Sequence, residues 1–427
     1  MLVSTASSAA VLCLALANNV ALARRAGADG RGVYALATAA LLLAWPVVTA
    51  GTPVAIVRFL GRKMDPRAVR GLGLVLLAGA TCVFGALALA RQFVPGPWGG
   101  LGPEVWGLLL VTVPPAAYHE YARFTFLGTG DLRRFNGVHL LSIGALTLAN
   151  ATLATPDPTR IVAILAAVWW SVAAVEVVAH LRAGVALPRR FEVRALLAFG
   201  RRSAVARLAE LGLVRADYLL LPFLVGLGPV GVYAIADQVA QALAFLAVTA
   251  GRVLQRFVAS QDDAAASAAR TARTSRLFVA VALAVGTAGA LGGAWGFPAL
   301  FGEAFAGASL GFVLLLPALV ARAVGAVVGP YLEGLGHAQP PARAAVIALA
   351  AQLTALVPAV LLFGWWGAAV VKSGAFVLQA LLLVRACPAG TRALGLWRPR
   401  LEDLAAASAV LRRLAGPRPS PETEAAP

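Results

Sequence analysis

The chain has 427 residues, of which 60% are hydrophobic and 13% are charged, and its mean hydropathy is +0.81. A soluble domain usually carries about 25% charged residues. The composition therefore excludes a soluble enzyme, a disordered chain and a nucleic-acid-binding module. The net charge of +17 must instead be explained by where the charges lie along the chain. The three cysteines are too scattered to form a disulfide framework or a metal site.

Long apolar runs dominate the sequence and predict an all-α polytopic membrane protein. A run of about 20 apolar residues is long enough to cross the hydrocarbon core of a bilayer. Twelve such spans are predicted, of which the seventh is interrupted by charges, at residues 2–23, 33–57, 71–90, 101–122, 137–154, 161–181, 203–223, 230–251, 277–297, 307–329, 344–363 and 366–386.

The arginines predict the orientation of these spans, because short cytoplasmic loops carry an excess of Lys and Arg. With the N-terminus inside, 27 of the 36 basic residues fall in inner loops and the tail, and five fall in outer loops. Both termini are therefore predicted to be cytoplasmic. Arg24 and Arg25 follow the first span and oppose this orientation locally. A cleaved signal peptide over residues 1–23 is the alternative for the first span, although no basic segment precedes it.

Two halves of the chain resemble one another at an offset near 199 residues. Residues 32–37 (GVYALA) recur as residues 231–236 (GVYAIA), and residues 48–51 (VTAG) recur as 248–251. Six spans in each half give both halves the same orientation, so a pseudo-two-fold axis along the membrane normal is expected, with a central cavity between the lobes. The predicted organisation is an N-lobe (1–181), a cytoplasmic connector (182–202), a C-lobe (203–386) and a cytoplasmic tail (387–427).

Charged residues inside the seventh span are costly in lipid and must face protein or water. At 100° per residue, Arg207, Glu210 and Asp217 lie within about 80° of one another, and Arg215 lies on the same half of the helix. A hydrated cavity face and a structural ion-pair network are both compatible with this pattern. By the repeat register, Asn18 in span 1 corresponds to Asp217.

Other spans contribute further polar residues. Asp237 and Gln241 lie one turn apart in span 8. Arg322 lies mid-span, where it either contacts an anionic substrate group or pairs internally with Asp237 or Asp217. Lys372 is expected to reach the outer interface by snorkelling.

Glu176 and His180 lie one turn apart in span 6, where a proton relay and a structural role both remain open. Ligand spacing for a metal, a phosphate loop for ATP and a nucleophile elbow are all absent from the sequence, so no cofactor and no catalytic residue is predicted. In the tail, residues 401–415 predict an amphipathic helix at the inner leaflet, with a disordered end after it.

Several segments resemble Wzx-like polysaccharide (O-antigen-type) flippases. They are residues 23–37 (ARRAGADGRGVYALA), 51–60 (GTPVAIVRFL), and 215–221 (RADYLLL) followed by 231–234 (GVYA). The resemblance extends over about residues 1–386 and departs from the common pattern in the charge-rich seventh span. It implies the multidrug/oligosaccharidyl-lipid/polysaccharide exporter (MOP) superfamily, with two six-helix lobes around a central cavity and alternating access.

The resemblance also implies a function. Wzx-like members are thought to move undecaprenyl-pyrophosphate-linked oligosaccharides from the inner to the outer leaflet of the bacterial cytoplasmic membrane, with cationic cavity residues at the pyrophosphate. The candidates here are Arg207, Arg215 and Arg322, with Asn18, Glu210, Asp217, Asp237 and Gln241 as further cavity or coupling residues. The expected protein is a monomeric transporter without enzymatic activity, with polysaccharide polymerase and glycosyltransferases as possible partners. A drug/cation antiporter of the same superfamily and a membrane glycan polymerase are the alternatives.

Overall fold

The computed structural model describes residues 2–61, 64–94, 99–260 and 263–400, and this part of the chain is almost entirely helical. The N-terminal half contains α1 (Leu2–Val48), α2 (Thr52–Leu60), α3 (Pro66–Arg91), α4 (Pro103–Gly128), α5 (Leu132–Leu153) and α6 (Pro158–Arg182). The C-terminal half contains α7 (Arg190–Arg215), α8 (Asp217–Val225), α9 (Leu227–Ala259), α10 (Ala264–Phe301), the short 3₁₀ helix η1 (Glu303–Phe305), α11 (Ala308–Leu314), α12 (Leu316–Gly334), α13 (Gln339–Phe363), α14 (Trp365–Ala386) and α15 (Ala389–Ala393).

Every one of the twelve predicted spans falls on a helix or on two consecutive helices. Spans 1 and 2 share α1, which is interrupted at Gly27 (φ 67°, ψ −167°), and span 2 continues into α2. Span 7 is divided between α7 and α8, and span 10 between α11 and α12. By length and apolarity alone, seven of the described helices could cross a membrane, or eight if the bent α9 is one span. The prediction of an all-α polytopic membrane fold is confirmed.

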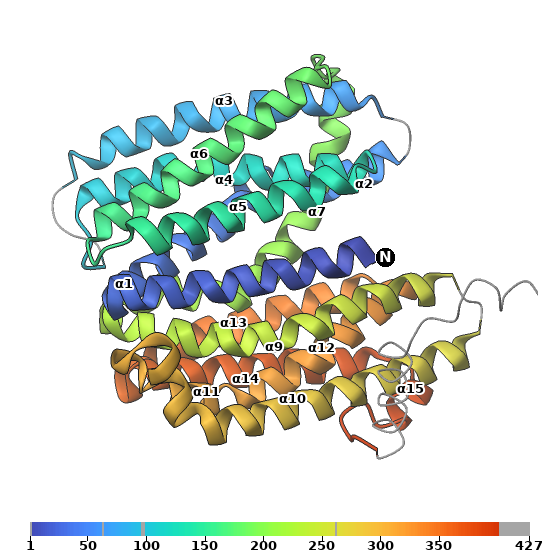
Figure 1. Cartoon of the computed structure of the whole chain (residues 1–427). Helices are drawn as coiled ribbons and strands as arrows, with labels where there is room; N and C mark the ends of the chain where they lie inside the picture. Colours follow the sequence, from blue (N-terminus) through green and yellow to red (C-terminus); the bar gives the residue numbers. More distant parts are fainter. Residues whose placement is uncertain (1, 62–63, 95–98, 261–262, 401–427) are drawn as a thin grey trace, which may run out of the picture.

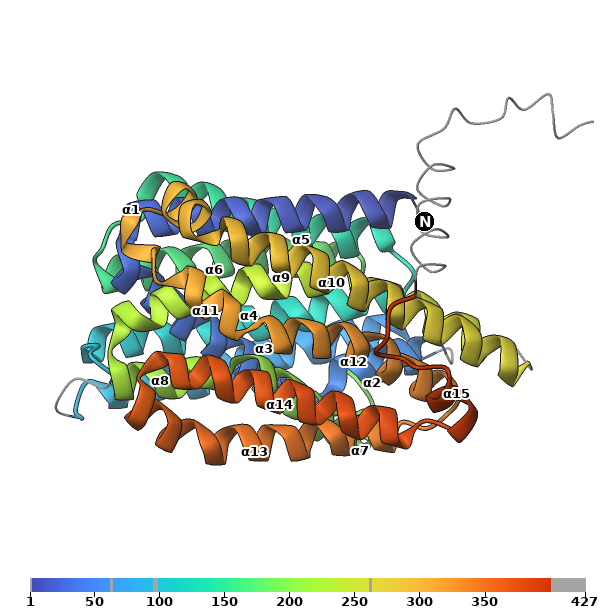
Figure 2. The same ribbon diagram turned by 90° about the horizontal axis from the view of Figure 1, so that it is seen from below.

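The helices form two groups that lie one above the other in Figure 1. Helices α2 to α6 make the upper group, α9 to α14 make the lower group, and α1 runs between them. The long helices of both groups run nearly parallel, as Figure 2 shows from below. Buried apolar clusters follow the same division, since one joins α1 with α4, α5 and α6, and the largest joins α1 with α7 through α14. This two-lobe arrangement is the one that the internal repeat predicts.

Aspartates at the ends of loops start several of these helices. Asp65, Asp131, Asp157 and Asp263 each accept hydrogen bonds from backbone N–H groups of the first helical turn. An acceptor at this position satisfies donors that have no partner within the helix. Four of the 19 acidic residues are therefore used to begin helices at the predicted membrane boundaries.

The region predicted as a connector, residues 182–202, is partly helical, because α7 already begins at Arg190. Before it, the backbone N–H of Ala186 donates to the carbonyl oxygen of Arg67 on α3, over 3.0 Å. Of the predicted tail, residues 387–400 fold back on α10, where Ser275 donates to the carbonyl of Leu396. The amphipathic helix predicted for 401–415, and the end after it, lie outside the described residues.

Candidate functional site

A buried group of charges lies where α8, α9 and α14 meet. The ammonium of Lys372 on α14 is 3.0 Å from Asp217 Oδ2 and 2.9 Å from Asp237 Oδ2. It also donates to the carbonyl oxygen of Val214 in the last turn of α7, over 2.8 Å. Lys372 is 1% exposed. The predicted snorkelling of Lys372 is wrong, because two carboxylates and a carbonyl in the protein interior offer it a complete set of acceptors.

Polar side chains complete this centre. Tyr233 donates to the carboxylate of Asp217, and both Tyr218 and Gln241 donate to that of Asp237. Arg215 lies 3.6 Å from Asp237 Oδ2. The two carboxylates, the ammonium and this guanidinium therefore balance to zero charge, and their hydrogen bonds offset part of the cost of burying them.

Two further guanidinium groups next to this centre lack a carboxylate partner among the described residues. Arg31 on α1 is 0% exposed, and its Nη2 donates to Asn19 Oδ1 over 3.0 Å, while its Nε and Nη1 have no hydrogen-bond partner there. Arg322 on α12 lies 4.9 Å above the ring of Phe376, and its buried Nη1 also has no partner.

Both arginines act electrostatically on Arg215 and on Asp237. The region between α1 and the C-lobe therefore holds two positive charges in excess, which favour an anionic ligand. The internal pairing of Arg322 with Asp237 or Asp217 is not seen in the described part of the chain.

The predicted charged face of span 7 is divided between two places. Arg207 pairs with Glu210 at 3.2 Å, and these side chains are 38% and 43% exposed. The Arg207 guanidinium lies 5.9 Å from the ring of Trp45 on α1. Arg215 and Asp217 belong instead to the buried centre, because the helix changes from α7 to α8 at Ala216. Sequence periodicity assumes one straight helix and therefore placed all four charges together.

The N-lobe holds an uncharged counterpart of this centre. Asn18 donates to the Tyr34 hydroxyl over 3.1 Å, and Asn150 donates to Asn18 Oδ1 over 2.8 Å. Asn18 and Tyr34 precede Asp217 and Tyr233 by the same 199 residues. The repeat register thus pairs Asn18 with Asp217 in the structure as well, with neutral chemistry in one lobe and charged chemistry in the other.

Sequence reasoning missed Arg31 and misplaced Lys372. The predicted topology counts Arg31 among the five basic residues of the outer loops, although it directly precedes the repeated GVYA segment at the start of span 2. Burial of both side chains depends on partners that are distant in sequence, which periodicity does not reveal.

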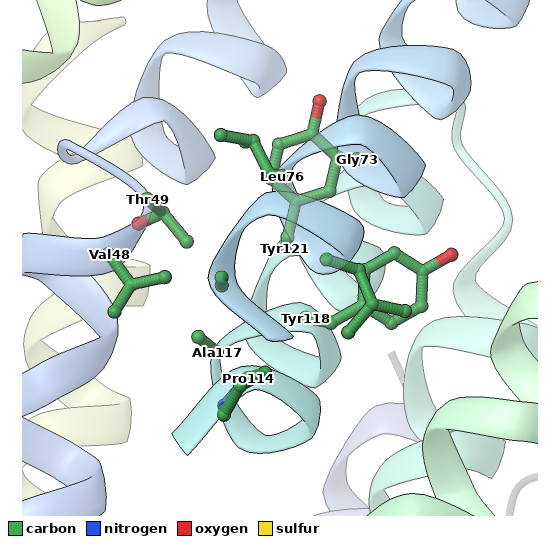
Figure 3. Close-up of a pocket in the computed structure, with 10 residues that line it drawn as sticks. Val48, Thr49, Gly73, Leu76, Pro114, Ala117, Tyr118 and Tyr121 are labelled. Atoms are coloured by element: carbon green, nitrogen blue, oxygen red, sulfur yellow. The ribbon is translucent and has the colours of Figure 1, made fainter. Parts of the chain in front are cut away.

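A small pocket lies within the N-lobe between α1, α3 and α4 (Figure 3). Val48 and Thr49 line one side, and Tyr118 and Tyr121 of α4 line another. The hydroxyl of Tyr118 points away from Val48 and Thr49 in this view. Within the described residues, no group of three or more His, Cys, Asp or Glu side chains is arranged to hold a metal ion.

Comparisons with known proteins identify the fold. No family model matches the chain, and no curated protein matches it in sequence. Among solved structures, the lipid II flippase MurJ in an inward closed conformation aligns with a TM-score of 0.71 at 12% identity, over 98% of this chain and 94% of that one. The chain has the fold of a MOP-superfamily transporter.

Two other MOP structures give the same result. The inward-facing conformation of a multidrug resistance MATE family transporter aligns with a TM-score of 0.64 at 14% identity, over 94% of this chain and 96% of that one. A MOP transporter from Pyrococcus furiosus, described as having a binding pocket of reverse polarity, aligns with a TM-score of 0.56 at 14% identity, over 95% and 94%. The MOP fold accounts for the two-lobe arrangement around α1 and α9.

Proposed function

We propose that this protein is a flippase that moves a lipid-linked oligosaccharide, of the undecaprenyl-pyrophosphate type, from the inner to the outer leaflet by alternating access. The observation that carries the proposal is the excess of positive charge that Arg31 and Arg322 add beside the Arg215–Asp237 pair. Guanidinium groups bind phosphate oxygens through paired, charge-assisted hydrogen bonds. The unpartnered N–H groups of Arg31 and Arg322 are suited to such an anion.

The membrane setting follows from the same proposal. The arginine distribution supports a cytoplasmic-membrane protein with both termini inside. A glycan polymerase and glycosyltransferases are the partners that such a substrate requires, and the flippase itself needs no catalytic residue. Arg207 forms an exposed ion pair with Glu210. The proposed substrate-binding arginines are therefore Arg31, Arg215 and Arg322.

A drug/cation antiporter is the second candidate, supported by the likeness to a multidrug resistance MATE structure. The charge at the lobe boundary argues against it, because a cationic drug would meet two guanidinium groups in excess. The charge of the preferred ligand therefore distinguishes the two functions.

The test compares two lipids that differ only in the pyrophosphate group, together with a cationic drug. The purified protein is titrated with undecaprenyl pyrophosphate, with uncharged undecaprenol and with ethidium, and binding is followed by thermal shift and native mass spectrometry. We expect Arg31→Gln and Arg322→Gln each to weaken undecaprenyl pyrophosphate binding about tenfold or more, as loss of a charged hydrogen bond does. Arg207→Gln is the matched control and should bind as the wild type does.

Equal affinity for undecaprenol and undecaprenyl pyrophosphate contradicts the proposed anion site. Preference for ethidium over both supports the antiporter instead.

A further inference from the structure

Three of the four histidines of the chain lie together inside the N-lobe. His119 is on α4, His139 is on α5 and His180 is on α6. His119 and His180 are 1% and 0% exposed. The fourth, His337, lies in the exposed turn between α12 and α13. The substrate site described above uses none of these three.

The centre of this cluster is a pair between His119 and Glu176. His119 Nδ1 lies 2.7 Å from Glu176 Oε1, and Glu176 is 0% exposed. The His119 ring centroid is 5.0 Å from that of Trp169 on α6 and 6.4 Å from that of His139. The pair is therefore enclosed by helices α4, α5 and α6. The one-turn spacing of Glu176 and His180 does not produce a contact between them, because each has a partner on α4.

Unfilled hydrogen-bonding positions surround the pair. Glu176 Oε2, His139 Nδ1 and His180 Nε2 are buried and have no partner in the described part of the chain. Buried polar atoms without partners are rare and call for an explanation such as a bound water or a mobile proton. Three of them on a carboxylate and two imidazoles point to a proton-handling site.

We propose that the His119–Glu176 pair binds and releases the proton that is exchanged for the exported substrate during transport. This inference rests on the proposed transport function. One proton held between Nδ1 and Oε1 leaves the pair with no net charge. Its loss leaves an unpaired carboxylate at membrane depth, which is strongly unfavourable without water. Release of the proton therefore requires α4, α5 and α6 to open toward water, and binding lets them close.

The titratable and charged groups around the pair come from α3, α4 and α5. On α4 these are Tyr118, Glu120 and Arg123, where Arg123 lies 3.0 Å from Glu120. His139 and Arg134 contribute from α5, and Arg70 acts on His180 from α3. Helix α1 approaches α6 at its other end, where Gly30 lies against Ile161. The Arg123–Glu120 ion pair has no net charge. The net charge of the His119–Glu176 pair therefore depends on whether the shared proton is bound.

A structural link connects the proton pair to the N-lobe pocket. Tyr118, the residue before His119, forms part of the pocket wall with its ring and binds His180 Nδ1 with its hydroxyl over 2.8 Å. Pro114 and Pro115 lie inside α4 one turn earlier, and Pro114 also lines the pocket. Proline removes backbone hydrogen bonds and makes a helix bend there. A shift of α4 on proton release therefore changes the pocket beside α1.

The first experiment observes the proton directly. Protonation of an imidazole next to an indole quenches indole fluorescence, so Trp169 reports on His119. The fluorescence of Trp169 is obtained by subtracting the emission of Trp169→Phe from that of the wild type, both in detergent, at each pH between 5 and 9. We expect a quenching transition that is lost in Glu176→Gln and His119→Gln and retained in the control His337→Gln. A flat wild-type signal, or a transition that survives in both variants, overturns the proposal.

The second experiment tests the coupling, with undecaprenyl pyrophosphate as the probe. Proton and substrate bind alternately in an exchanger, so the affinity for undecaprenyl pyrophosphate should rise as the proton is lost. We expect a rise of about fivefold or more from pH 6 to pH 8. One linked proton can change the affinity by at most about tenfold per pH unit. In Glu176→Gln this increase should shrink to the part that comes from ionisation of the pyrophosphate itself, whose last pKa lies at about 6.

The two experiments separate the two proposals. A normal Trp169 titration without any undecaprenyl pyrophosphate binding contradicts the proposed substrate and leaves the proton site supported. Binding whose pH dependence is the same in Glu176→Gln as in the wild type contradicts the proton site alone.

Discussion

Gly32 and Gly231 meet the opposite lobe in the same way. A Cβ atom on Gly32 would lie 2.0 Å from the carbonyl oxygen of Leu227, and one on Gly231 would lie 1.9 Å from that of Ala28. The two glycines are 199 residues apart, and so are the two residues that they contact, Ala28 and Leu227. The second half of α1 and the start of α9 therefore cross through a reciprocal contact, as expected at a pseudo-two-fold axis.

A methyl group at either glycine must push the two helices apart. We expect Gly32→Ala and Gly231→Ala each to lower the free energy of unfolding by about 1–3 kcal/mol, the range seen for overpacking. Thermal unfolding in detergent measures this. Gly144→Ala on α5 is the matched control, because nothing lies within 4 Å of a Cβ there. Equal melting temperatures for all three variants contradict the close crossing.

The repeat shows how far the sequence predicts this fold. The GVYA segments predicted two lobes in one orientation, and the same segments form the crossing of α1 and α9. Apolar runs located all twelve spans because each is long compared with the error in its ends. The break between α7 and α8 at Ala216 was not predicted. Residues 213–221 contain no glycine and no proline that would indicate the end of a helix.

The candidate site was predicted less completely. Asp217, Asp237 and Gln241 were selected because polar residues inside spans are costly, and the structure brings them together. The role of Lys372 could not be derived, because its partners lie 155 and 135 residues away in the chain. A lysine in the outer half of a span can extend to the lipid headgroups or pair with a carboxylate inside the protein. Hydropathy does not distinguish these two arrangements.

Removal of the Lys372 ammonium should be strongly destabilising. In Lys372→Met, the carboxylates of Asp217 and Asp237 lose the ammonium that they share, and Arg215 remains as the ion-pair partner of Asp237 alone. Removing one partner of a buried ion pair lowers the free energy of unfolding by about 3–5 kcal/mol. The measurement is thermal unfolding of the purified protein.

Neutralising one carboxylate should reverse most of this loss. The double variant Lys372→Met/Asp217→Asn restores charge balance and retains an acceptor for the Tyr233 hydroxyl. We expect its melting temperature to lie well above that of Lys372→Met. If the double variant is no more stable than the single one, charge balance is not the reason for the lysine.

The exposed pair of Arg207 and Glu210 should contribute little to stability. Surface ion pairs at this spacing contribute at most about 1 kcal/mol. Arg207→Gln should therefore melt within a few degrees of the wild type, and higher salt should narrow the difference. A large loss of stability would place Arg207 in a buried network, contrary to its 38% exposure.

Arg24 joins the two lobes at the predicted outer side. Its Nε donates to the carbonyl oxygen of Leu300 over 2.9 Å, and its Nη2 donates to that of Ala299 over 2.6 Å. These carbonyls belong to the last turn of α10, where helical partners are missing. A structural use for Arg24 is consistent with its position opposing the orientation given by the other arginines.

Loss of this contact should loosen the outer side of the lobe boundary. We expect Arg24→Ala to lower the free energy of unfolding by about 1 kcal/mol, the net value of an ordinary hydrogen bond. A cysteine introduced as Ala28→Cys, at the crossing with Gly231, should react faster with a water-soluble maleimide when Arg24 is absent. Arg160→Ala, an exposed arginine on the same predicted side, is the control. Equal labelling rates in the two backgrounds would mean that Arg24 does not hold the lobes together.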